Sequence, residues 1–261
     1  MLDLKEGPVS EVGPHFSVTS MTPRELLNSG KLSNALQTLT AEVRDNPTDL
    51  KRRSFLFELL CFAGDYDRAE KHLDVLSRES HAASLGALLY RAALHADRLR
   101  HEMFAKKEYP MRSGESAAEA PKSGVLNGVP FQTFADADAR IGTRLEVFAA
   151  GSYLWIPFEH IESLEMAAPR RLRDLLWAPV TIRTGPAFNV RELGEVFVPV
   201  LSPFSSKHAD ETVRLGRATV WESYDSGESV PFGQKLFLAD DGEVAILEIR
   251  SLRFTPAGET S

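Results

Sequence analysis

A short pattern that recurs after 34 residues constrains the fold of this chain more than any other sequence feature. Residues 30–39 align with residues 64–73, and both segments have glycine first, alanine sixth and leucine tenth. This period is that of tetratricopeptide repeats, whose unit is a pair of antiparallel helices. Glycine permits the turn between the helices, alanine allows their close approach, and leucine continues the buried stripe. We therefore expect tetratricopeptide-like helical hairpins over residues 21–107.

Local signals indicate where the helical region begins and how far it extends. Thr22-Pro23-Arg24-Glu25 predicts a helix start, with a capping hydroxyl, proline in the first turn and glutamate at the capping-box position. Residues 85–94 form a third apolar segment, but Arg98 stands where the next turn glycine would fall, so we expect two units and one capping helix. Residues 1–20 contain two Gly-Pro pairs and predict a flexible lead-in.

The second half of the chain has the pattern of a β-rich domain. Residues 108–126 collect glycine, proline and serine and predict a linker. Beyond it the hydrophobic period falls toward two, which indicates strands. Hairpins are predicted at 144–158, around Gly151-Ser152, and at 237–249, around Asp240-Asp241-Gly242, where glycine would supply positive φ. Further strand candidates are 129–134, 161–166, 180–184, 195–200 and 218–222, with a short helix at about 170–177.

These patterns together predict an α+β chain of two domains. The first is the helical unit, and the second is a small antiparallel, barrel-like domain with one short helix over residues 127–256. Residues 257–261 are expected to form a tail.

Composition and charge argue against several functional classes. The formal net charge of −7 does not indicate the basic surface that nucleic-acid binding needs. The basic cluster at 170–173 is followed at once by Asp174, so it indicates a solvated helix face or a partner for carboxylates. No apolar run reaches the roughly 18–20 residues of a membrane span, so no membrane association is expected. The single cysteine, Cys61, and the lack of an export leader favour a cytoplasmic protein.

The most reactive-looking stretch of the chain is Asp136, Asp138 and Arg140. A calcium loop would have glycine and glutamate at its sixth and twelfth positions, where this chain has isoleucine and valine. We expect a turn instead, in which the aspartates accept hydrogen bonds from turn amides, Arg140 pairs with one of them and Gly142 reverses the chain. No metal, phosphate-loop or nucleophile motif is present, so no cofactor, metal or catalytic residue is expected. Acid–base pairs that meet only in space stay open.

Several runs of the second half then carry a family resemblance. The order and spacing of residues 126–131, 136–147, 153–161 and 172–179, and later of 214–222 and 246–250, resemble the ImpE/TagJ family of type VI secretion accessory proteins. The likeness extends over about residues 22–254.

The resemblance implies a non-enzymatic cytoplasmic protein with a tetratricopeptide-like helical part and a β-rich part. It implies association with the N-terminal helical segment of the small contractile-sheath subunit, and an indirect relation to the sheath-recycling ATPase. Candidate binding residues are those that match the family's motif, namely Asp136, Asp138, Arg140, Trp155 and Trp177. Their types suit turn-building and core packing at least as well as binding.

Two other classes of function stay open at this point: an enzyme with a site in the β domain, and a scaffold of another assembly. A deep pocket lined by converging ionisable groups would favour the enzyme. An apolar helical groove beside a shallow β surface would favour an adaptor that binds a helical peptide.

Overall fold

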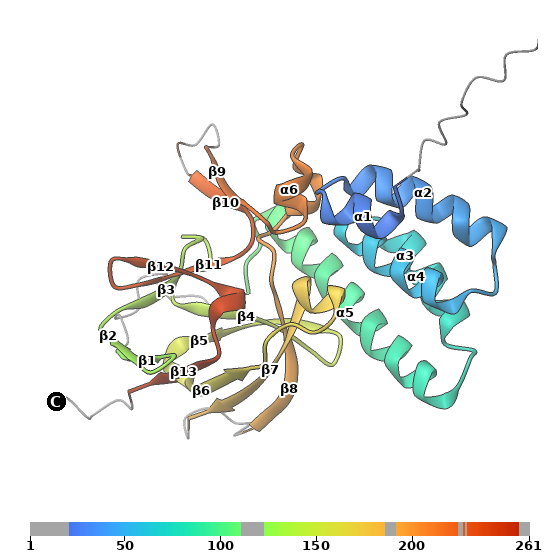
Figure 1. The fold of residues 1–261 in the computed structure, drawn as a ribbon. Coiled ribbons are helices and arrows are strands. Elements are labelled where there is room, and N and C mark those ends of the chain that lie inside the picture. The colour runs from blue at the N-terminus through green and yellow to red at the C-terminus, as the bar shows by residue number, and fades with distance from the viewer. Residues whose placement is uncertain (1–20, 111–122, 186–191, 224–226, 228, 256–261) are drawn as a thin grey trace, which may run out of the picture.

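The computed structural model describes residues 21–110, 123–185, 192–223, 227 and 229–255 (Figure 1). The fold is α+β, with helices in the first half and antiparallel strands in the second. The last long helix lies between the other helices and the strands (Figure 1). The expected lead-in, most of the expected linker and the tail fall outside the described residues.

Five helices lie within the described residues 21–110, and consecutive helices pack on one another. Their bounds are α1 (Pro23–Asn28), α2 (Leu32–Asp45), α3 (Leu50–Phe62), α4 (Tyr66–Leu76) and α5 (His81–Lys106). The predicted capping box is present at Thr22 and Glu25. The turns after α1 and α3 contain Gly30 and Gly64 at φ of 80° and 72°, a left-handed conformation that costs glycine little. The turn glycines are thus confirmed, whereas the assignment to the tetratricopeptide class stays a prediction.

Helix α5 is longer than the capping helix expected from the sequence. It runs for 26 residues from its N-cap Ser80, because Arg98 is a good helix former and continues the helix where a glycine would have ended it. The C-terminal half of α5 packs against the sheet. It buries Ala96, Arg100 and Phe104, which are spaced four residues apart on one face of the helix.

The main sheet has eight strands in the order β2-β1-β13-β6-β7-β8-β4-β5, and every adjacent pair is antiparallel. The bounds are β1 (Gly124–Leu126), β2 (Val129–Phe131), β4 (Arg144–Ala149), β5 (Ser152–Pro157), β6 (Ile161–Met166), β7 (Trp177–Thr184), β8 (Glu192–Pro199) and β13 (Ser251–Phe254).

The expectation of a barrel-like domain was wrong, because this sheet is open. Among the described residues its outer strands β2 and β5 do not pair with each other. Proline lacks the N–H that a further ladder needs, and both outer strands contain one, Pro130 and Pro157. Helix α5 also packs against β5, so that end of the sheet is covered by a helix.

Two smaller sheets complete the strand-rich half. One has the order β12-β11-β3, and the other is a two-stranded ribbon of β9 and β10 that projects beside the short helix α6 (Figure 1). The bounds are β3 (Phe134–Asp136), β9 (Thr219–Ser223), β10 (Ser229–Gly233), β11 (Leu236–Ala239), β12 (Gly242–Ala245) and α6 (Glu211–Arg214). Single 3-10 turns occur at η1 (Phe158–His160), η2 (Leu172–Leu175), η3 (Ser205–Lys207) and η4 (Ile246–Glu248).

Several sequence boundaries need correction. The expected helix at 170–177 is only the turn η2, and residues 124–126 of the expected linker form β1. The predicted β11–β12 hairpin is present, but its second arm ends at Ala245. Its positive φ belongs to Asp240 rather than Gly242, because the Asp240 carboxylate accepts the backbone N–H groups of residues 132 and 133, which holds it there.

The apolar core is continuous across the predicted linker. Buried residues of the helices and of the strands belong to one cluster, and Tyr90 of α5 stacks on Trp177 of β7 and Phe197 of β8. The division into two domains therefore stays a prediction.

Candidate functional site

An apolar groove of about 470 Å³ lies between α3, α4, α5 and the segment at 171–173, where the chain enters η2. Phe57, Leu73 and Ala87 form buried parts of its lining, and Tyr90 is half-buried there. Arg171 and Arg173 reach it from the strand-rich half. The groove is therefore built by both halves of the chain.

The groove is open because α5 turns a row of small residues toward it. Ala82, Ala83, Gly86 and Ala87 all line it, at positions that lie on one side of a helix. A Cβ placed on Gly86 would meet no atom within 4 Å. The space that larger side chains would fill thus stays free.

At the edge of the groove, α5 exposes an apolar ridge made of Leu85, Leu88 and Leu89, which are 55%, 62% and 47% exposed, and Leu89 also lines the groove. Residues 82–94 are apolar on nearly every side of the helix, a pattern typical of a helix that is covered all round. A contiguous exposed apolar surface marks an interaction site in many proteins. The groove and the ridge together are the candidate binding surface.

The floor of the groove rests on Trp177. Tyr90 lies on this indole with ring centroids 6.2 Å apart and contacts Phe57 at 6.0 Å. The guanidinium of Arg173 lies 4.7 Å from the centre of the Tyr90 ring and pairs with Glu58 at 3.1 Å. Trp177 itself is only 2% exposed, so it supports the groove from below.

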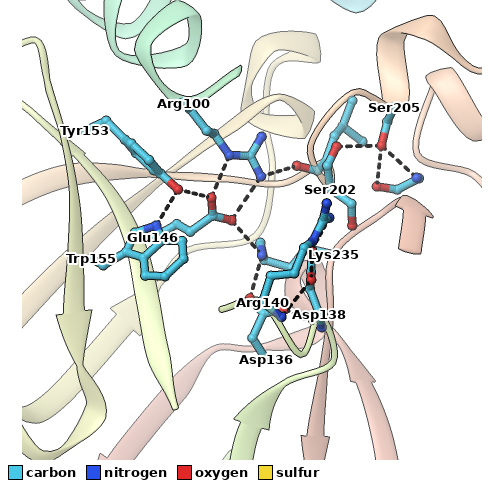
Figure 2. A network of polar contacts seen from close by, with 12 residues as sticks. Arg100, Asp136, Asp138, Arg140, Glu146, Tyr153, Trp155, Ser202, Ser205 and Lys235 are labelled. Atoms are coloured by element: carbon cyan, nitrogen blue, oxygen red, sulfur yellow. Dashed lines mark hydrogen bonds and ion pairs between the residues drawn. The ribbon is translucent and has the colours of Figure 1, made fainter. Parts of the chain in front are cut away.

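A buried polar network lies further along α5, in its C-terminal half, where the helix meets the sheet (Figure 2). Arg100 donates Nε and Nη2 to the two oxygens of Glu146 at 2.7 and 2.9 Å, and Nη2 also donates to the Leu201 carbonyl at 3.0 Å. Lys235 Nζ lies 2.7 Å from Glu146 Oε2 and 2.5 Å from Asp136 Oδ2. These four charged side chains are at most 3% exposed. The network ties α5 to β3, β4 and the segment before β11.

The Asp136–Gly142 turn is attached to this network and has the predicted geometry. Asp136 Oδ1 accepts the backbone N–H of Asp138 at 2.9 Å, and Asp138 accepts Arg140 Nε and Nη2 at 2.8 and 2.6 Å. Gly142 has φ of 63°. The carboxylates are therefore satisfied within the turn and by Lys235.

Trp155 joins the same network through a tyrosine. Its Nε1 donates to the Tyr153 hydroxyl, which donates to Glu146 at 2.6 Å. Four of the five candidate residues, Asp136, Asp138, Arg140 and Trp155, thus surround one buried cluster, and Trp177 lies apart under the groove. A binding role for the five stays a prediction.

Sequence reasoning missed the residues that hold the network together. Arg100, Glu146 and Lys235 are distant in sequence, and only Glu146 lies in a run that carries the family resemblance, where it was not singled out. One signal was available: Glu146 interrupts an apolar strand between Leu145 and Val147. A single carboxylate in such a strand does not identify its partner.

Burial and charge shift the pKa values of the network in opposite directions. Burial raises the pKa of Asp136 to about 7, although the attraction of Lys235 opposes this. Burial alone would also raise the pKa of Glu146, but Arg100 and Lys235 hold it well below its usual range. The pKa of Lys235 is raised, because the two carboxylates outweigh its own desolvation.

The raised pKa of Asp136 predicts a specific pH dependence of stability. Between its ordinary value of 3.8 and about 7, the folded chain holds a proton that the unfolded chain has released. The stability from this group is therefore present at low pH and is lost as the pH rises through about 7. In Asp136→Asn this contribution is absent, so the change in melting temperature between about pH 5 and pH 8 should be smaller than in wild type. Thermal unfolding at both pH values measures it, with exposed Asp45→Asn as control. If the change in melting temperature between the two pH values were the same in Asp136→Asn as in wild type, the raised pKa of Asp136 would be wrong.

The network offers little room for chemistry on a substrate. A neighbouring cavity lined by Asp97, Arg100 and His101 has a volume of only about 20 Å³, which is enough for a water-sized molecule. Among the residues that the structure describes, no group of three or more His, Cys, Asp or Glu side chains is placed to hold a metal ion. In the same described part of the chain, no helix has the length and apolar character needed to span a membrane.

Comparisons with known proteins agree with this architecture and identify the family. The model of the ImpE protein family matches residues 128–253. The type VI secretion system accessory component TagJ of Pseudomonas aeruginosa is 34% identical over 269 aligned residues, which cover 91% of this chain and 92% of that protein. The X-ray structure of protein VPA1032 from Vibrio parahaemolyticus has the same fold, with a TM-score of 0.77 at 23% identity over 89% of this chain and 97% of that one. This chain therefore belongs to the ImpE/TagJ family of type VI secretion system accessory proteins.

Proposed function

We propose that this protein is a cytoplasmic, non-enzymatic adaptor of a type VI secretion system. In this proposal it binds the N-terminal helical segment of the small contractile-sheath subunit and influences sheath assembly or recycling. Its relation to the recycling ATPase is then indirect and runs through the sheath subunit. The relative named as an accessory component of such a system supports this class of role.

The groove is the observation that carries the proposal. Its α5 wall extends from Ala82 to Tyr90, which corresponds to about 12 Å at the rise of an α-helix, or roughly two helical turns. An amphipathic helix recognised in this way places apolar anchors at i, i+3, i+4 and i+7 in the groove. The small residues on α5 allow a second helix backbone to approach closely.

The enzyme alternative has weaker support. The ionisable groups that converge at the helix–sheet junction, Arg100, Glu146, Lys235 and Asp136, are buried and paired with one another. A more polar cavity of about 660 Å³, with carboxylate and guanidinium groups in its lining, lies against β6, β7 and β13. The open groove is lined mainly by apolar side chains instead. This arrangement favours an adaptor over an enzyme. Whether the adaptor serves the sheath or another assembly is decided by identifying the partner that binds.

The proposal predicts that wild-type protein binds a peptide of the sheath subunit's N-terminal helical segment, whereas Gly86→Leu binds it at least about tenfold more weakly. The leucine side chain would occupy the open space at Gly86, and leucine is a better helix former than glycine, so the fold should persist. Isothermal titration calorimetry measures both affinities. Gln37→Leu adds the same side chain at an exposed position of α2 outside the groove and should bind like wild type.

The two outcomes that count against the proposal are distinct. Absence of binding to folded wild-type protein would refute the sheath segment as the partner. Equal affinity for wild type and Gly86→Leu would refute the groove as its site.

A further inference from the structure

The two ends of the groove carry opposite charge. Arg173 contacts Tyr90 and Glu58, so the arginine-bearing loop lies at the Tyr90 end. Glu79 lines the other end, where it precedes the N-cap of α5. A helix bound along the groove would therefore have one end near the arginines and the other end near Glu79.

Two exposed arginines can meet a partner at the cationic end: Arg171 lines the groove, and Arg170 directly precedes it in the chain. The backbone N–H groups of Arg170 and Arg171 both donate to Asp174 Oδ2 at 2.9 Å, which fixes the loop. Both residues are exposed. In the part of the chain that the structure describes, Arg173 pairs with Glu58, but no carboxylate pairs with the guanidinium of Arg170 or Arg171.

Building on the function proposed above, we propose that the groove selects an amphipathic helix that runs in the same direction as α5 and carries acidic side chains near its C-terminal end. In this orientation the partially negative C-terminus of the helix faces the arginines, and its partially positive N-terminus faces Glu79. Acidic side chains in the last turns pair with Arg170 and Arg171 at the rim. The apolar anchors give affinity, and the charges set the direction.

The two halves of the chain contribute different parts of this binding surface. Helices α3, α4 and α5 supply the apolar walls, whereas the loop at 170–173 belongs to the strand-rich half. A bound helix would therefore contact both halves and depend on their relative position.

Two designed helical peptides test the inference without using the sheath segment. Both have the same apolar stripe and composition, but one has its acidic residues in the C-terminal half and the other in the N-terminal half. By fluorescence anisotropy at low salt, the first should bind about three- to tenfold more tightly, as expected for two exposed ion pairs. This preference should disappear in Arg170→Gln/Arg171→Gln and at about 0.5 M salt. It should persist in Arg44→Gln/Lys71→Gln, which removes two exposed charges outside the groove.

Equal binding, the reverse preference, or no binding of either peptide would overturn the inference. If the designed peptide shows the preference while the sheath segment fails to bind, the proposed partner is wrong and the inference stands. If the sheath segment binds and is blocked by Gly86→Leu while the designed pair shows no preference, the proposed function stands and the inference falls.

Discussion

Glu146→Ala is expected to lower the free energy of unfolding by about 3–5 kcal/mol, because it leaves buried cations without their shared carboxylate. Arg100 loses its bidentate partner, and Lys235 keeps only Asp136. Since Arg100 belongs to α5 and Glu146 to β4, the loss should also loosen the contact between helix and sheet. Urea unfolding followed by circular dichroism measures the effect.

An exposed ion pair provides the matched control. Glu102 pairs with Lys106 on the surface of α5, and both side chains are more than half exposed. Glu102→Ala should therefore change stability far less than Glu146→Ala does, because water screens an exposed ion pair. If Glu146→Ala had an effect as small as this, the network would not be the junction between α5 and the sheet.

Trp177→Ala is the second large effect that we expect, with a loss of about 3–5 kcal/mol from a buried aromatic side chain. The indole is 2% exposed and lies under Tyr90, so its removal opens a cavity below the groove. Peptide binding should weaken as well, because Tyr90 loses the ring that holds it in place. Thermal unfolding and the calorimetric titration, the latter at a temperature where the variant is folded, measure the two consequences.

Trp221→Ala is the control for this substitution. Trp221 lies on β9 and is 43% exposed, so its truncation should change stability by about 0.5 kcal/mol or less and leave peptide affinity unchanged. If Trp177→Ala kept full peptide affinity while remaining folded, Tyr90 would not depend on this support.

Features encoded by neighbouring residues could be predicted from the sequence. The capping box at Thr22, the turn glycines 30 and 64, and the strand at Ile161–Met166 are all present as expected. The Asp138–Arg140 pair also involves residues two positions apart. In each case the interaction closes within one turn or one strand, so the local pattern contains the necessary information.

Features that depend on distant residues could not be predicted in the same way. Arg100 and Glu146 are 46 positions apart and meet only because α5 packs on β4. Whether a sheet closes depends on how its outer strands meet, which the strand pattern does not reveal. The groove exists because Ala82, Gly86 and Ala87 have small or no side chains. In the sequence these residues indicate only a helix, and the groove is recognised once the packing of α3 and α4 around α5 is known.

Site-specific photo-crosslinking from position 89 tests the central claim most directly. A photoreactive leucine analogue in place of Leu89, which lines the groove and is 47% exposed, leaves the open space at Gly86 free, and the same analogue at exposed Gln37 lies outside the groove. We predict that position 89 crosslinks to the N-terminal helical segment of the small sheath subunit and that position 37 does not. No crosslink at either position, or equal crosslinking from both, would contradict it.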